Sequence, residues 1–132
     1  FEYLWMKINK SDVPIKQILL NQKIIAGIGN IYASEILFDA RISPLTKGKN
    51  LDLKQIRKII KSTRKILNKA IRAGGSTLQN YTAADGTLGN FQKNFKVYNK
   101  NGQKILGKKI KRIIQYGRST YFCPDLQKID KN

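Results

Sequence analysis

The sequence predicts an α+β protein in which a bundle of helices precedes two consecutive β-hairpins. Three observations support this fold class. Between residues 53 and 70, apolar side chains recur every three to four positions, as in a helix that buries one face. From residue 95 onward the pattern changes to alternation interrupted by turn residues, which is typical of hairpins. Nearer the amino end, two helical segments are separated by a turn that contains Gly27 and Gly29.

The first two helices are predicted from the residues that can begin and end them. Ser11 or Asp12 can cap the first helix, and Pro14 suits its first turn. Apolar residues continue at helical spacing over residues 15–22 until the glycines interrupt them. A second helix is predicted from Asn30 until Pro44 breaks the pattern. The segment is therefore a helix, a glycine-containing turn and a helix.

A long amphipathic helix is predicted next. Asn50 or Asp52 can cap it, and Gly74-Gly75 can end it. Its predicted inner positions are Leu53, Ile56, Ile60, Thr63, Leu67 and Ala70. Its predicted outer positions are Lys54, Arg57, Lys58, Lys61, Arg64 and Lys65. Surface helices need a polar face in any case, so a solvated face explains any one of these lysines as readily as a binding role.

Two hairpins are predicted in the last 40 residues. Residues 95–98 alternate, residues 99–102 have turn chemistry, and residues 109–114 and 120–123 form strands around a turn at 115–119. Two short hairpins bury little surface by themselves. They must therefore pack on the helices or be held together by another device.

Composition favours nucleic acid as the partner. The chain has 26 Lys and Arg residues against 8 Asp and Glu, a net charge of +18, and the excess lies in residues 47–72 and 93–118. The longest uncharged stretches, residues 24–34 and 73–84, are shorter than the ~20 residues of a membrane span, so we expect no membrane association. A single cysteine and no recognisable secretory signal favour a reduced, cytoplasmic location.

Residues 26–32, AGIGNIY, place two glycines immediately before a helix. Glycine allows a ligand close to the backbone, and a helix amino terminus offers N–H groups to an anion such as phosphate. Taken alone, such a pattern is more often a turn between two core helices. Together with PIK at 14–16, LNQK at 20–23, ASE at 33–35 and ISP at 42–44, it resembles the helix–two-turn–helix region of the formamidopyrimidine-DNA glycosylases, bacterial enzymes that remove oxidised purines.

The resemblance continues in order and spacing through the rest of the chain, with GGSTL at 74–78, DG at 85–86, GNF at 89–91, VY at 97–98 and GRSTYFC at 117–123. It implies a helix–two-turn–helix DNA-binding domain over residues 1–92 and a zinc-finger type of double hairpin over residues 93–132. It also implies the function: the DNA-binding half of a base-excision-repair DNA glycosylase and AP lyase that removes 8-oxoguanine and formamidopyrimidines.

The resemblance also assigns roles to single residues. Lys16 and Asn30, beside Gly29, would hold the phosphates that flank the lesion, and Arg118 at the tip of the last hairpin would reach the DNA backbone or minor groove. A cation, an amide at a helix start and a guanidinium are all good phosphate partners. Without the family, Arg118 would be taken for an ordinary turn residue. Residues 79–91 would form the loop that closes over the flipped base, with Gln79, Tyr81 and Thr82 in it.

One departure from the family concerns catalysis. The related enzymes carry their nucleophile, an amino-terminal proline followed by glutamate, in a preceding β-rich domain, whereas this chain starts with Phe1-Glu2. The chain has no histidine, which also excludes a serine or cysteine nucleophile paired with histidine. We therefore expect no catalytic residue here, a missing amino-terminal catalytic domain, and no activity from these 132 residues alone.

A second departure concerns zinc. The family usually ends in a C-x₂-C-x₁₆-C-x₂-C finger, and Cys123 is the one cysteine of this chain. Single cysteines inserted between Lys104 and Ile105, between Leu106 and Gly107, and between Asp125 and Leu126 restore that spacing. We therefore hypothesise that the native protein has these cysteines and one structural zinc ion at Cys123. Taken literally, the sequence makes Cys123 a buried or free thiol.

We expect a monomer of bacterial, nucleoid-associated type that binds double-stranded DNA with an oxidised purine or abasic site, together with its own catalytic domain. Two alternatives stay open. The first is a non-catalytic RNA-binding protein, which the net charge alone would favour. The second is an architectural DNA-binding protein with no enzyme attached. A glycosylase half should prefer kinked or abasic duplex DNA, whereas an RNA-binding protein should prefer single-stranded or structured RNA.

Overall fold

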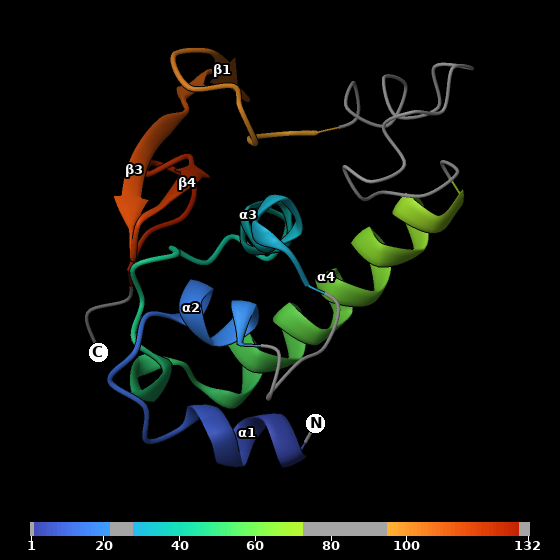
Figure 1. Ribbon diagram of the computed structural model, residues 1–132, viewed down its shortest axis with the longest axis vertical. Coiled ribbons are helices and arrows are strands. Elements are labelled where there is room, and N and C mark those ends of the chain that lie inside the picture. The colour runs from blue at the N-terminus through green and yellow to red at the C-terminus, as the bar shows by residue number, and fades with distance from the viewer. Residues whose placement is uncertain (1, 22–27, 73–94, 130–132) are drawn as a thin grey trace.

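The computed structural model describes residues 2–21, 28–72 and 95–129 (Figure 1). The helices are α1 (Glu2–Ile8), α2 (Ile15–Leu20), α3 (Asn30–Asp39) and α4 (Leu53–Arg72), with a 3₁₀ turn η1 (Gly48–Asn50) before α4. The strands are β1 (Lys104–Ile105), β2 (Lys108–Lys109), β3 (Lys111–Gln115) and β4 (Arg118–Phe122). The predicted α+β class, with helices first and two hairpins last, is confirmed.

Helix α3 is the centre of the molecule. It packs against α2 and α4 of the helical part and against β4 of the hairpins (Figure 1). The fully buried core residues of these three helices are Ile15, Leu19, Ala33, Ile36, Leu37, Ile56 and Ile59. Burial of one Ile or Leu side chain contributes about 1.5–3 kcal/mol. This cluster therefore stabilises the helical part and fixes the direction of α3.

Helix α4 begins at a capping box, as expected for Asp52. The Gln55 N–H donates to Asp52 Oδ1 at 2.7 Å, and the Asp52 N–H donates to Gln55 Oε1 at 2.9 Å. The six basic residues predicted on its outer face are exposed. Leu53, expected on the inner face, is 44% exposed because it is the first residue of the helix and precedes the core. The predicted glycine stop at 74–75 lies outside the described residues.

Helix α1 is absent from the prediction, since seven residues are too few to show two turns of periodicity. It buries Leu4 and Ile8. Gly48 in η1 packs closely against it: a Cβ at this position would lie 2.7 Å from the Ile8 carbonyl oxygen and 2.8 Å from Ile18 Cδ1. Only glycine allows the chain to pass between α1 and α2 at this point.

Each hairpin closes with a two-residue turn in which both residues have positive φ. The turn of β1 and β2 has Leu106 at 51° and Gly107 at 78°, and that of β3 and β4 has Tyr116 at 52° and Gly117 at 77°. Both are turns of type I′, which match the twist of antiparallel strands. Strands β3 and β4 pair in register from Lys111–Phe122 to Gln115–Arg118, so the predicted second hairpin is confirmed.

Residues 95–98 do not form the expected strand. The Glu35 carboxylate accepts the N–H groups of three successive residues, Lys96 at 2.6 Å, Val97 at 2.9 Å and Tyr98 at 2.8 Å. These N–H groups are therefore not available to a neighbouring strand. The first hairpin forms farther along, at residues 104–109, where Lys104 pairs with Lys109.

The carboxy-terminal finger, defined here as residues 95–129, packs on α3 through a second apolar cluster. Its buried members are Phe38, Val97, Ile110, Tyr121 and Cys123, and Tyr98, Ile105 and Leu126 pack against them. Tyr98 also packs against the helical core and so joins the two clusters. The hairpins are thus attached to the helices by packing. This is the first of the two alternatives that the sequence left open for hairpins of this size.

Candidate nucleic-acid interface

Two side chains from different helices meet at one carbonyl group of the finger. Lys16, near the start of α2, donates from Nζ to the Ser119 carbonyl oxygen at 3.1 Å and to Thr120 Oγ1 at 2.6 Å. Asn30, the first residue of α3, donates from Nδ2 to the same Ser119 oxygen at 3.0 Å. These contacts place the starts of α2 and α3 beside the first residues of β4.

The acceptors are themselves held in place. Thr120 Oγ1 accepts from Lys16 and donates to Gln115 Oε1 at 2.8 Å, while Gln115 Nε2 donates to the Pro44 carbonyl oxygen at 3.3 Å. Thr120 and Gln115 are both buried. This network connects the β3–β4 hairpin with the loop after α3, so the position of the turn at residues 116–117 is fixed relative to the helices.

Lys16 is a buried cation without a counter-ion in the described part of the chain. Its exposed fraction is 0%, and both of its hydrogen-bond partners are neutral oxygens. Burial, together with the nearby positive charge of Arg118, lowers the pKa of Lys16 to about 8. A buried ammonium that lacks an anion is costly. The geometry therefore favours an anionic ligand beside Lys16 and Arg118.

Arg118 lies at the edge of a hollow between α2 and the last hairpin. The hollow has a volume of about 340 Å³ and is lined by Val13, Gln17, Leu20, Asn21, Tyr116 and Arg118. Arg118 is exposed and pairs with Gln115 directly after the two-residue turn. Gln17 Oε1 is buried and has no hydrogen-bond partner among the described residues. The hollow thus combines one cationic side chain, Arg118, with one acceptor, Gln17 Oε1, that has no partner among the described residues.

Gly29 caps α3 and borders open space. A Cβ at Gly29 would meet no heavy atom within 4 Å, so packing within the chain does not require glycine there. The first helical hydrogen bond runs from the Ala33 N–H to the Gly29 carbonyl oxygen at 2.9 Å. Asn30 Oδ1 is buried without a hydrogen-bond partner among the described residues. A ligand backbone can therefore approach the start of α3 closely.

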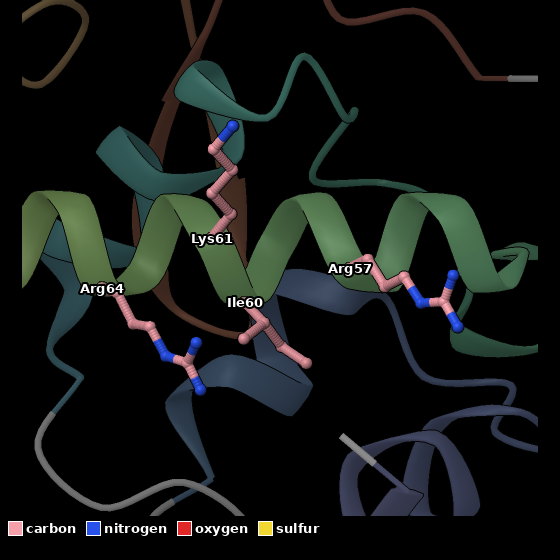
Figure 2. Close-up of a pocket in the computed structure, with 4 residues that line it drawn as sticks. All are labelled: Arg57, Ile60, Lys61 and Arg64. Atoms are coloured by element: carbon pink, nitrogen blue, oxygen red, sulfur yellow. The ribbon is translucent and has the colours of Figure 1, made fainter.

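A second basic surface lies on α4, away from these contacts. Arg57, Ile60, Lys61 and Arg64 line a hollow of about 340 Å³, and Figure 2 shows Lys61 extending in the opposite direction from Ile60. The three charged side chains are exposed. Nothing in this hollow resembles the network around Lys16, because its lining comes from one helix alone. Exposed positive charge of this kind attracts polyanions in general.

Comparison with known proteins gives the family. The formamidopyrimidine-DNA glycosylase H2TH domain matches residues 1–82, more than half of the chain. The chain belongs to the formamidopyrimidine-DNA glycosylase family. It is 48% identical over 128 residues to the formamidopyrimidine-DNA glycosylase of Zymomonas mobilis, which covers 96% of this chain and 47% of that protein. It is also 48% identical over 124 residues to that of a Wolbachia species from Brugia malayi, covering 92% and 46%.

Solved structures agree with this family and with the fold. A complex of Lactococcus lactis Fpg with DNA that contains an abasic site matches with a TM-score of 0.86 and 39% identity, over 96% of this chain and 47% of that one. A complex of L. lactis Fpg with DNA that contains Fapy-dG matches with a TM-score of 0.85 and 36% identity, over 96% and 46%. The chain spans about half the length of the glycosylases it matches, their carboxy-terminal part.

The structure brings together four of the residues that the family resemblance singles out. Lys16 and Asn30 meet at Ser119, Gly29 lies beside Asn30, and Arg118 precedes Ser119. Gln79, Tyr81 and Thr82 of the expected lesion loop, and Gly27 of the turn, lie outside the described residues. Sequence reasoning missed Thr120, Gln115 and Glu35. Of these, Glu35 alone gave a signal, as a single acidic residue inside the apolar run of residues 31–38.

The residues present do not fit the zinc ion of glycosylase fingers. Counted back and forward from Cys123, the C-x₂-C-x₁₆-C-x₂-C spacing falls on Gln103, Leu106 and Leu126. The chain therefore has the family's spacing without any inserted cysteine, and residues other than cysteine stand at three of the four positions. Gln103 and Leu106 are exposed, whereas Cys123 is fully buried. No group of three or more His, Cys, Asp or Glu side chains that could hold a metal occurs among the described residues.

No helix in the described part of the chain is both long and apolar enough to cross a membrane. This agrees with the short uncharged stretches of the sequence.

Proposed function

We propose that this chain is the DNA-binding half of a base-excision DNA glycosylase and AP lyase that removes oxidised purines such as 8-oxoguanine and formamidopyrimidines. In this proposal residues 1–92 form the helix–two-turn–helix domain, residues 79–91 the lesion loop, and residues 93–132 the finger. A catalytic domain that is not among these residues supplies the chemistry. The ligand is double-stranded DNA with an oxidised purine or an abasic site.

The observation that carries the proposal is the buried ammonium of Lys16. It lies beside the amide of Asn30 and near Arg118, and among the described residues none of its partners is a carboxylate. A phosphate group beside the exposed Arg118 would bring negative charge close to this buried ammonium and accept charge-assisted hydrogen bonds from the guanidinium. Phosphate contacts fix the register of a protein on duplex DNA without reading its sequence. A protein that recognises a damaged base in any sequence needs contacts of this kind.

The related proteins support the choice of DNA. Two of the matching structures are Fpg complexes with DNA that holds an abasic site or Fapy-dG. An enzyme that acts on a base must extrude it from the stack, and the duplex must be held firmly while this happens. The contacts around Ser119 connect two helices and a hairpin, and so form a rigid holder for the flanking backbone.

Binding to a duplex with a tetrahydrofuran abasic-site analogue tests the proposal. Lys16→Met and Arg118→Ala should each weaken binding and lower the slope of log Kd against log salt by about 1, because each removes one positive charge beside the phosphate. Methionine keeps the length of the buried lysine stem, so the core around position 16 stays filled. The far-ultraviolet circular dichroism of both variants checks that the helices remain folded.

Lys61→Ala is the matched control, because it removes an exposed cation from α4, on the other basic surface. Its effect should be small. Equal losses for all three variants would show diffuse attraction and contradict a defined site. Equal or tighter binding of single-stranded RNA would favour the non-catalytic RNA-binding alternative instead.

We also propose that these 132 residues alone neither excise 8-oxoguanine nor cleave an abasic site. The three prolines of the chain, Pro14, Pro44 and Pro124, are all internal, so their nitrogens are amides and not amines. In the related enzymes the Schiff base with the abasic sugar forms on the amine of an amino-terminal proline, which an internal proline does not have; the lysines also carry amines, but in this proposal none of them takes the place of that proline. Borohydride treatment with abasic DNA should therefore trap no covalent adduct, and an adduct would overturn this point.

A further inference from the structure

The second pair of positions of the family spacing lies in the apolar cluster of the finger. Cys123 and Leu126 occupy the second C-x₂-C pair of the register, and both belong to the cluster: Cys123 is fully buried, and Leu126 packs against it from the next turn. Ile105, beside the first pair of positions, also packs against the cluster. Three side chains at or beside these positions thus belong to one apolar cluster or pack against it.

The first pair of positions of the spacing, residues 103 and 106, lies in the first hairpin and its tight turn. Leu106 and Gly107 form a tight turn with φ values of 51° and 78°, and Ile105 pairs with Lys108 across it. At the open end of this hairpin, away from the turn, the Gln103 carbonyl oxygen accepts the Ile110 N–H at 2.8 Å. The turn directs Ile105 inward and leaves Leu106 71% exposed. The hairpin is therefore closed by its own hydrogen bonds.

Two side chains attach the finger to the helices at opposite ends. Gln127 Oε1 accepts the Cys123 N–H at 2.7 Å, and Gln127 Nε2 donates to the Ile42 carbonyl oxygen at 3.0 Å. Glu35 of α3 accepts three N–H groups at residues 96–98. Both side chains are buried, with exposed fractions of 1% and 3%. Each satisfies backbone donors that a short, irregular segment would otherwise leave unpaired.

We propose that an apolar cluster and two hydrogen-bonding side chains, Glu35 and Gln127, hold this finger in place of a zinc ion, so that it presents Arg118 without metal. Structural zinc sites use four thiolate or imidazole ligands, and their proteins unfold when the metal is removed. This finger has one thiol, packed as a small apolar side chain. Its fold depends on packing, which chelators do not affect.

The experiment uses the 132-residue chain produced in zinc-supplemented medium. Mass spectrometry of the metal content should find no stoichiometric zinc, and excess 1,10-phenanthroline should leave the thermal midpoint unchanged. These two measurements do not involve DNA, so they stand even if the proposed function fails. About one zinc ion per chain, or a midpoint that falls on chelation, would overturn the proposal.

Substitutions separate packing from ligation. Cys123→Ala should keep affinity for abasic-site DNA within about twofold, because it removes only a small apolar group. Leu126→Asp should weaken binding by about tenfold or more, because it places an unpaired charge against the cluster. Gln103→Asp is the matched control: it introduces the same charge at an exposed position of the same register, and its effect should be small.

The fold of each variant is checked separately. The helical part has its own core, so the far-ultraviolet helical signal of Leu126→Asp should remain while the finger loosens. The Tyr121 N–H donates to Ser34 Oγ of α3 at 3.5 Å, so hydrogen exchange at this amide reports whether the finger stays packed on α3. A Cys123→Ala variant that is as damaging as Leu126→Asp, or a Leu126→Asp variant with unchanged exchange and affinity, would contradict the packing role.

Discussion

Replacement of Glu35 by glutamine tests how the finger is attached to α3. In the native side chain Oε1 accepts the Lys96 N–H, and Oε2 accepts those of Val97 and Tyr98. Three donors facing two oxygens favour the ionised carboxylate, although burial raises the pKa of Glu35. Glutamine has the same shape but only one oxygen. Its NH₂ group must therefore face at least one of these N–H donors.

The expected cost follows from the number of bonds lost. If the glutamine oxygen takes the place of Oε2, the bonds to Val97 and Tyr98 remain and the one to Lys96 is lost. A hydrogen bond to a charged group contributes about 1.5–3 kcal/mol, and the two remaining bonds lose their charge assistance. The smaller cost of burying a neutral amide offsets part of this loss. We expect the free energy of unfolding to fall by about 2 kcal/mol.

Thermal unfolding measures the effect. For a chain of this size a change of 1 kcal/mol moves the midpoint by roughly 3–5 °C, so Glu35→Gln should melt about 6–10 °C lower at pH 7. Hydrogen exchange at the Val97 amide should accelerate as well, because its acceptor loses charge. Asp12→Asn is the control: Asp12 pairs with Lys49 at the surface, and its loss should have no measurable effect.

The reasoning fails if Glu35→Gln and Asp12→Asn melt at the same temperature. It also fails if Glu35→Gln melts lower while Val97 exchange is unchanged, since the damage would then lie elsewhere.

Three further predictions concern other residues. Gly48→Ala should lower the free energy of unfolding by about 1–3 kcal/mol in urea titration, because its Cβ would lie 2.7 Å from the Ile8 carbonyl oxygen; an unchanged urea midpoint would show that the chain can move aside. Leu106→Asn should raise the thermal midpoint by about 2–4 °C, because Asn-Gly is the preferred pair of a type I′ turn, and a lower midpoint would contradict the turn assignment. DNA affinity should fall as pH rises through about 8, because Lys16 of the chain without bound DNA then loses its proton and its positive charge. Binding titrations from pH 7 to 9.5 should show no such step for Lys16→Met. The same step in both proteins would assign it to another group.

The parts of the fold that the sequence predicts are those whose signal is local. The long helix has five turns of regular periodicity and a cap at Asp52, and the second hairpin has a Tyr-Gly turn between alternating strands. The missed parts depend on distant partners. Residues 95–98 alternate like a strand, but the acceptor of their N–H groups, Glu35, lies 61–63 residues earlier in the chain. No local pattern contains that information.

The candidate site shows the same division. The resemblance to the family located Lys16, Asn30 and Arg118, and their residue types suit phosphate. It gave no indication that Lys16 and Asn30 share the Ser119 carbonyl oxygen, 103 and 89 residues away. Every residue has a carbonyl group, so composition and spacing cannot mark one as a meeting point. The positions of the zinc spacing, in contrast, were available by counting from Cys123.

The register of the last hairpin limits where the chain can change in length. Successive residues of β4 face opposite sides, so Thr120 presents its hydroxyl to Lys16 while Tyr121 packs in the apolar cluster. Deletion of the single residue between Arg118 and Thr120 would move Tyr121 into the position of Thr120 and place a ring where Lys16 has the hydroxyl oxygen. The tip of the first hairpin, at the exposed Leu106, has no such constraint. Insertions and deletions, in evolution or in engineering, should therefore accumulate at that tip and be absent from β4.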